Sequence, residues 1–215
     1  MHIPSVFCEE NFDSIIDFIA AKPLATIIAQ TSQGIEACHI PLFFHEECSE
    51  PNGQQRYLYG HFGRKNPIYL EALADTSWLI IFQDSGHYIS PNWYPSKAQT
   101  HKEVPTWNYQ SVHIQSKIEL LEDTAKLKWI LATMTAQQEI VSENPWSLED
   151  APATYIDAMC RGIIGFRLTI DAIQAQFKLS QNKTADNIAG VIKGLEQLNT
   201  SDALTMAAKV ATHNS

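Results

Sequence analysis

The sequence predicts a mainly β fold with accessory helices (α+β), in which six or more strands close into a single antiparallel barrel with helical caps. Short apolar, β-branched runs separated by turn residues recur along the chain. Helical segments do not alternate regularly with these runs, which disfavours a doubly wound sheet. No linker or shift in composition divides the 215 residues, so we expect one domain over residues 1–215.

The expected strands are short apolar or alternating segments. They span residues 24–29, 35–44, 57–61, 78–82, 107–121 and 163–179, the last as one bent strand or two. The first two form a hairpin around the turn at residues 32–34, and residues 87–90 extend the sheet. Between the expected strands 35–44 and 57–61, residues 45–54 are predicted to form an acidic loop with Asn52 and Gly53 as its turn signal.

The expected helices carry apolar residues three and four positions apart. They span residues 11–21, 68–74, 124–141, 153–160 and 185–198. Asn199 ends the last of them, which we expect to be the final element of the chain.

Charge and composition exclude several classes of protein. The net charge of −9 and the scattered 15 lysines and arginines argue against an autonomous DNA-binding module. No apolar stretch is long enough to span a membrane, and no signal peptide precedes the first strand. The four cysteines form no CxxC pair, so we expect free thiols in the cytoplasm. The acidic loop with His45 and Cys48 lacks tetrahedral ligand spacing, and we predict no metal site.

A basic turn after the third strand is a candidate phosphate site. His61, Gly63, Arg64, Lys65 and Asn66 combine a close backbone approach, two cations and the start of a helix. An exposed basic turn without a ligand is the competing interpretation.

The segment from His87 to His113 contains three prolines, two tryptophans and three tyrosines. Such a composition predicts a rigid loop that either stacks on a planar ring or forms a dimer interface. Candidate contact residues in this loop are Trp93, Lys97, Thr106, Trp107 and Asn108.

Two further segments carry polar candidates beside strands. Lys178, Gln181 and Asn182 could bind a cofactor, or Asn182 and Thr184 could cap the last helix instead. His39, beside Pro41 in the second strand, indicates either a strand edge that faces a ligand or a histidine bonded to backbone.

Several ordered motifs resemble the PaiB family, whose members are described as FMN-binding negative transcriptional regulators. The resemblance runs from Met1 to about Leu195. It is carried by His-Ile-Pro-Leu at 39–42, Trp-Tyr-Pro-Ser-Lys at 93–97, Val-Pro-Thr-Trp-Asn-Tyr at 104–109 and Lys-Leu-Ser-Gln-Asn-Lys at 178–183.

The resemblance implies a six-stranded antiparallel split barrel, related to pyridoxamine 5′-phosphate oxidase, that forms a homodimer with FMN at the interface. The flavin phosphate would lie between residues 39–42 and the basic turn. The implied FMN-binding residues are His39, Ile40, Leu42, His61, Arg64, Lys65, Asn66, Trp93, Lys97, Thr106, Trp107, Asn108, Lys178, Gln181 and Asn182. His39 replaces the arginine of the oxidase pattern, and the oxidase Arg-Leu-Ala-Pro segment is absent, which argues against vitamin B6 oxidase activity.

Three functions remain open on the sequence. The chain could be an FMN-binding regulator that senses redox state or a metabolite and represses genes directly on DNA or through a partner. It could be a flavin-dependent oxidoreductase with an indirect regulatory effect, for which no catalytic residue stands out. It could also be a heme-binding split barrel, since histidines are available.

Overall fold

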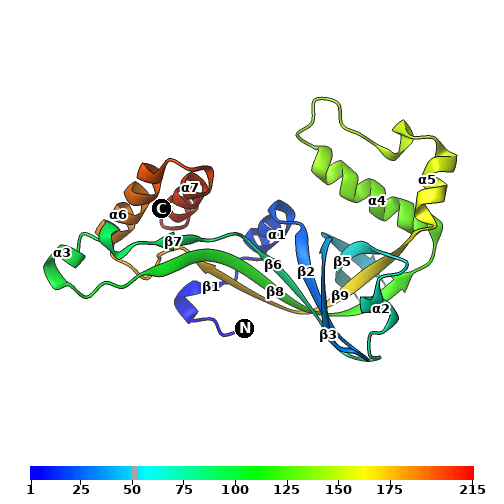
Figure 1. Ribbon diagram of the computed structural model, residues 1–215, viewed down its shortest axis with the longest axis horizontal. Coiled ribbons are helices and arrows are strands. Elements are labelled where there is room, and N and C mark those ends of the chain that lie inside the picture. Colours follow the sequence, from blue (N-terminus) through cyan, green and yellow to red (C-terminus); the bar gives the residue numbers. More distant parts are fainter. Residues whose placement is uncertain (50–52) are drawn as a thin grey trace. The chain divides into compact units, whose positions relative to one another are not determined.

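The computed structural model describes residues 1–49 and 53–215 (Figure 1). Its strands are β1 (Cys8–Glu9), β2 (Leu24–Thr31), β3 (Gly34–Pro41), β4 (Phe43–Ser49), β5 (Gly53–Gly63), β6 (Trp78–Gln83), β7 (His87–Ile89), β8 (Thr106–Leu121) and β9 (Ile163–Lys178). Its α-helices are α1 (Phe12–Ala21), α2 (Pro67–Leu70), α3 (Lys97–Thr100), α4 (Thr124–Glu139), α5 (Ala153–Cys160), α6 (Ala185–Leu198) and α7 (Ser201–His213).

The strands of the described residues form one nine-stranded sheet, in which β1–β9, β2–β3, β2–β6, β4–β5, β5–β9 and β7–β8 pair antiparallel. Its main path runs β3-β2-β6-β8-β9-β5-β4, while β1 pairs with β9 and β7 pairs with β8. The mainly β, α+β split-barrel class is therefore confirmed, but the expected six strands become nine.

The chain divides into two compact units. Unit 1 comprises residues 1–15, 83–112 and 174–215, and unit 2 comprises residues 16–82 and 113–173. The long strands β8 and β9 contribute residues to both units. The expectation of one domain over residues 1–215 stays a prediction.

The core of unit 2 lies on the side of β5 that carries Leu58, Gly60 and Phe62. Phe62 stacks on Phe166 of β9 with ring centroids 4.2 Å apart, and both side chains are fully buried. A Cβ atom at Gly60 would lie 2.6 Å from a Leu42 methyl carbon, so this close strand packing requires glycine. Large buried rings of this kind contribute most of the apolar area removed from water.

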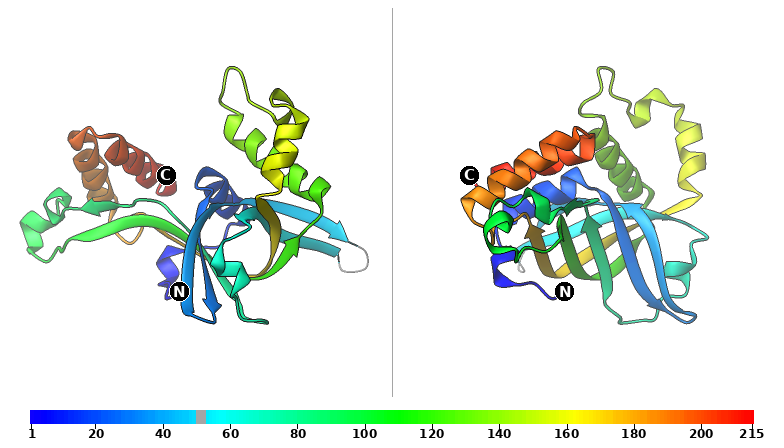
Figure 2. Two further views of the ribbon diagram at one scale, coloured as in Figure 1. Left: turned by 45° about the vertical axis from the view of Figure 1, so that its right-hand side comes forward. Right: turned by 60° about the vertical axis from the view of Figure 1, so that its left-hand side comes forward.

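The opposite side of β5 carries Tyr57, Tyr59 and His61, and α4 packs there. Phe43, Tyr57, Tyr59 and Ile130 form one buried cluster, against which Trp129 of α4 also packs. Figure 2 shows α4 and α5 together on one side of the strands of unit 2. Helix α4 therefore covers the β4–β5 surface that would otherwise be exposed.

Most predicted elements are confirmed, and three boundaries are wrong for identifiable reasons. Residues 45–49 and 53–54 are strand rather than loop, because β4 pairs with β5 from Phe43 to Ser49 and from Gly53 onward. Asn52 lies outside the described residues. In β4, Glu47 is stabilised by Tyr59 Oη and by Lys126 Nζ at 3.0 Å. The acidic run therefore reflects an ion-pair network on a strand.

The strand expected over residues 35–44 is two strands. β3 ends at Pro41, which has no N–H to donate, and Leu42 N instead donates to Pro23 O at 2.9 Å. The helix expected over 68–74 ends at Leu70, and Leu73 N donates to Gln30 O at 2.9 Å.

The sequence interpretation missed the final helix, α7, because it took the helix that ends at Asn199 to be the last element of the chain. Asn199 adopts a left-handed conformation (φ 51°) after α6, and Thr200 then caps α7 through Ala203 N. The buried face of α7 carries Ala203, Met206, Ala207 and Val210, which have helical spacing but include two small alanines. Among the described residues, no helix is long and apolar enough to cross a membrane.

Candidate functional site

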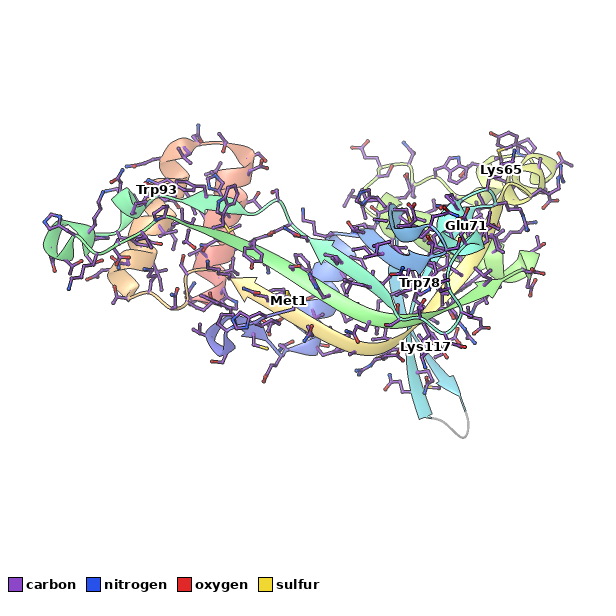
Figure 3. The ribbon with its side chains drawn as sticks, turned by 60° about the horizontal axis from the view of Figure 1, so that its bottom comes forward. Met1, Lys65, Glu71, Trp78, Trp93 and Lys117 are labelled. Atoms are coloured by element: carbon purple, nitrogen blue, oxygen red, sulfur yellow. The ribbon has the colours of Figure 1, made fainter. Side chains whose placement is uncertain are left out.

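The predicted basic turn is a rigid backbone structure at the end of β5. Asn66 N donates to Gly63 O at 2.9 Å, and Arg64 N donates to Gly162 O at 2.9 Å. Arg64 Nε donates to Arg161 O at 3.0 Å, and Tyr69 Oη donates to Arg64 O at 2.7 Å. The side chains of Arg64 and Lys65 are exposed, so two cations project from a fixed turn. Lys65 is labelled in Figure 3.

Asn66 has a structural role in this turn. Its Oδ1 accepts from Ile68 N at 3.1 Å and caps α2, and its side chain also hydrogen-bonds the Cys38 thiol. Burial raises the pKa of that thiol, and the bond to Asn66 opposes the rise. Asn66 therefore joins the turn to β3. Because α2 has only four residues, the cations rather than a helix dipole would attract an anion.

The residues of the His-Ile-Pro-Leu motif face different ways. His39 is exposed, and its Nδ1 lies 3.1 Å from Thr26 Oγ1. Ile40 and Leu42 are 8% and 2% exposed and belong to the core. Of these three candidates, therefore, only His39 is exposed to solvent.

His61 lines a cavity of about 380 Å³ in unit 2, on the side of β5 that faces α4. Its Nδ1 is buried and has no hydrogen-bond partner among the described residues. Burial lowers the pKa of His61, so the imidazole is neutral near pH 7. His61 thus differs from Arg64 and Lys65, which follow it in the chain. Its imidazole is neutral and partly buried, whereas their side chains are charged and exposed.

The aromatic loop in unit 1 packs against α6. The Trp93 ring covers Gly194, where a Cβ atom would lie 2.3 Å from Trp93 Cγ; Figure 3 shows Trp93 beside α6. Tyr94 is 2% exposed, and Lys183 Nζ lies 4.6 Å from the centre of its ring. Trp93 and Tyr94 therefore fix the loop to the helix.

A polar network centred on Glu103 and Asn187 completes this attachment. Glu103 Oε1 accepts from Ser96 Oγ at 2.7 Å, and Glu103 Oε2 accepts from Lys183 Nζ at 2.7 Å. Asn187, only 3% exposed, donates to Ser96 Oγ at 2.9 Å and to Glu103 at 3.3 Å. The pKa of Glu103 is lowered, first by its bond with Lys183 and then by Ser96. Sequence reasoning missed Glu103 and Asn187, which stand outside the aromatic motifs.

The remaining candidates of unit 1 meet between β8 and the end of β9. Lys178 Nζ donates to Thr106 Oγ1 at 2.6 Å, and Asn108 Nδ2 donates to Ser180 Oγ at 2.8 Å. Partial burial and, to a lesser degree, Lys183 lower the pKa of Lys178. The structure therefore brings the predicted residues 106–108 and 178–182 together.

Several candidates in this group already form hydrogen bonds within the chain, and others are exposed. Gln181 bonds the backbone of Phe177 and Leu179, and Lys97 Nζ bonds Asn92 Oδ1. Trp107 is 53% exposed and Asn182 is exposed, so these side chains can reach a ligand or partner. Thr184, rather than Asn182, caps α6.

The fifteen candidates therefore form two groups in separate units. The group in unit 2 comprises His39, Ile40, Leu42, His61, Arg64, Lys65 and Asn66, and the group in unit 1 comprises Trp93, Lys97, Thr106, Trp107, Asn108, Lys178, Gln181 and Asn182. Among the described residues, no cluster of histidine, cysteine, aspartate and glutamate could hold a metal ion.

Comparison with known proteins assigns the chain to a family. Residues 1–172 match the family described as "Putative FMN-binding domain", and the chain belongs to this family. It is 32% identical, over 96% of its length and 95% of the relative's, to Protease synthase and sporulation protein PAI 2 of Bacillus subtilis. The resemblance to the PaiB family is thereby confirmed.

Solved structures share the fold at low sequence identity. The flavocytochrome Anf3 from Azotobacter vinelandii gives a TM-score of 0.56 at 13% identity and covers 82% of this chain and 72% of its own. An FAD and heme binding protein from Mycobacterium smegmatis gives 0.54 at 15% identity, with coverage of 85% and 78%. These likenesses concern the fold alone.

We predict that Gly194→Ala destabilises the protein by about 1–2 kcal/mol. Alanine favours the helical state by up to about 1 kcal/mol, but overpacking against Trp93 costs about 1–3 kcal/mol. Urea unfolding followed by circular dichroism measures the change. Gly162→Ala is the control, since its Cβ would meet no atom closer than 3.4 Å. Equal stability of the Gly194 variant and the wild type would contradict the packing.

We also predict that His61 makes the protein less stable in acid. Its folded-state pKa is lowered, so the unfolded chain takes up the proton first, and the stabilisation present above about pH 6.5 is lost as pH falls below that value. Melting temperatures between pH 8 and pH 5 should therefore fall less for His61→Gln than for the wild type. His101→Gln, at an exposed position, should keep the wild-type profile. Identical profiles for all three proteins would refute the assignment.

Proposed function

We propose that the chain binds FMN and acts as a PaiB-type negative transcriptional regulator that senses redox state or a metabolite. The observation that carries the proposal is the exposed pair Arg64–Lys65 on a fixed turn, in a chain of the FMN-binding family. Regulation comes from the family resemblance, and the FMN site comes from the family and the chemistry of the turn.

The turn fits the phosphate of FMN. With Arg64 Nε held by Arg161 O, the terminal guanidinium nitrogens remain available to a phosphate, and Lys65 adds a second charge. Neither side chain has an acidic partner within the described part of the chain, so the phosphate need not displace a carboxylate. Bound FMN would supply the redox-active ring, whose electronics nearby donors and charges tune.

The group of unit 1 would contact the second subunit of the homodimer or a flavin ring bound by that subunit. Trp107 is exposed and forms an edge contact with Tyr88, 6.3 Å between ring centroids. Such aromatic side chains offer a large flat surface at little cost in conformational entropy. Trp93 is committed to α6, so we assign ring contact to Trp107 and not to Trp93.

We propose that the protein is a homodimer, with a second copy covering the outer face of the β2–β3 hairpin. This face carries Leu24 (64% exposed), Ile28, Ile35 (74% exposed), Ala37 and His39, brought together by the register of the hairpin. Exposed aliphatic side chains gathered on one face are typical of subunit interfaces. His39 would place a polar group inside this interface, near the cofactor.

The regulatory effect is more consistent with a partner protein than with direct DNA contact. Six of the 15 lysines and arginines, at positions 56, 126, 128, 167, 183 and 209, already form ion pairs with carboxylates. Together with the net charge of −9, this leaves little positive surface for the phosphates of DNA.

A flavin-dependent oxidoreductase is the second candidate function. The cavity beside His61 favours it, because a cavity of about 380 Å³ is within the range that small substrates occupy. Turnover of a nicotinamide cofactor or a quinone by the FMN-loaded protein would support this candidate.

We predict that Arg64→Ala/Lys65→Ala weakens FMN binding by about 1–3 kcal/mol for each charge-assisted bond lost. Titration of the protein with FMN, followed by quenching of flavin fluorescence, measures the affinity. Lys22→Ala/Lys117→Ala removes the same charge from exposed positions and should leave the affinity unchanged. Equal weakening in both double variants would indicate a general charge effect and contradict a phosphate site at the turn.

We further predict weak, non-specific binding of promoter DNA, with a dissociation constant above about 1 µM at physiological salt. Mobility-shift experiments over a range of salt concentrations, with promoter and scrambled fragments, measure it. Tight binding that prefers the promoter sequence would instead establish direct repression.

A further inference from the structure

We propose that the cavity beneath α4 is a separate binding site for a small, neutral aromatic molecule. This inference does not rest on FMN binding. The site uses His61 and residues of α4, whereas the proposed phosphate site uses the exposed cations of the turn.

The lining of the cavity selects an aromatic ligand. Its apolar walls are formed by Pro41, Leu42 and Phe43 on the strand side and by Met134 on the helix side, and Trp146 also lines it. Flat rings pack well against proline, phenylalanine and tryptophan, and the methionine thioether adapts to ring edges. An apolar cavity of about 150 Å³ holds one benzene molecule. A cavity of about 380 Å³ therefore has room for two fused rings.

The charges of the cavity exclude an anion. Its described lining residues include no lysine or arginine, and the one ionisable acid among them, Glu139, accepts a bond from Trp146 N at 3.1 Å. His61 is neutral near pH 7 because burial lowers its pKa. A phosphate or carboxylate would therefore lie beside a carboxylate and without a counter-charge, which is unfavourable. This distinguishes the cavity from the cationic turn.

The unsatisfied imidazole of His61 indicates that the ligand carries a polar group. The His61 ring lines the cavity, and its Nδ1 is buried without a partner among the described residues, so Nε2 is the ring nitrogen that a ligand in the cavity could reach. Because Nε2 of a neutral imidazole can be either the donor or the acceptor, one hydroxyl or amide group on the ligand would pair with it. The ligand class is thus a two-ring aromatic compound with a single neutral polar substituent.

Matched probes and variants of the full chain test the proposal by isothermal titration calorimetry. We expect 2-naphthol to bind one site per chain with a dissociation constant on the order of 10–100 µM. The same ring with a carboxylate, 2-naphthoate, should bind at least about tenfold more weakly. Met134→Trp fills the cavity and should abolish binding, whereas Met159→Trp makes the same change at an exposed position of α5 and should not.

A second variant covers the case in which Met134→Trp fails to fold. His61→Phe keeps a ring but removes both nitrogens, so 2-naphthol should bind about tenfold more weakly, as expected for one lost hydrogen bond. Equal binding of the two probes, or unchanged binding in both His61→Phe and Met134→Trp, would overturn the proposal.

Competition with FMN separates this site from the proposed flavin site. We expect saturating FMN to leave the affinity for 2-naphthol unchanged, and we expect Arg64→Ala/Lys65→Ala to weaken FMN alone. Competitive displacement of 2-naphthol by FMN would show that the cavity holds the flavin and would overturn the separate site while supporting FMN binding. Failure of FMN to bind, with 2-naphthol still bound, would reject the proposed function and leave this inference standing.

Discussion

The alternation of side chains along β5 is the constraint on which the organisation of unit 2 depends. Successive residues of a strand point to opposite faces, so Leu58, Gly60 and Phe62 enter the core while Tyr57, Tyr59 and His61 face α4. A shift of one residue would put His61 into the Phe62–Phe166 stack and expose Phe62 to the helix. The same register also determines where β5 ends, and hence where Arg64 and Lys65 leave the sheet.

Helix α4 stabilises this register through charge as well as apolar packing. Lys126 of α4 lies 4.1 Å from the centre of the Trp129 ring and pairs with Glu47 of β4. Arg167 of β9 lies 3.4 Å from Glu47 and 2.8 Å from Glu119. The desolvated Tyr59 hydroxyl donates to Glu47, and both burial and this bond raise the pKa of Tyr59. Because Glu47 serves several partners at once, β4 can contain acidic residues and still remain a strand.

The order of the elements could be predicted from the sequence because most of them have strong periodic patterns. Helix α5 has the predicted bounds, and β6 was recognisable from its unbroken hydrophobicity. Helix α7 could not be recognised so easily, because two of its four buried residues are alanine and because it depends on packing against α6 for its stability. Likewise, the acidic residues of β4 resemble a loop until their cationic partners, distant in sequence, are known.

The candidate site was only partly predictable, for a related reason. Motif residues identify the segments that form the site. The sequence does not show which of their side chains pack against other elements and so cannot reach a ligand. Trp93 and Tyr94 stand in the strongest motif of the chain, yet they fix the loop to α6, while Trp107 remains exposed. Asn66 stands in the basic turn, yet it caps α2 and bonds Cys38. The residues that hold the loop in place, Glu103 and Asn187, are polar residues without a motif.

His61 and Arg64 show how a short segment can serve two chemistries. The two residues are three positions apart. His61 is a neutral imidazole beside an apolar cavity, and Arg64 is an exposed guanidinium fixed by a backbone carbonyl. Burial favours the neutral form of the first, and exposure keeps the second hydrated until an anion arrives. A flavin phosphate and a neutral ring place opposite demands on a binding site. The end of β5 can meet both because it passes from a covered surface into solvent within three residues.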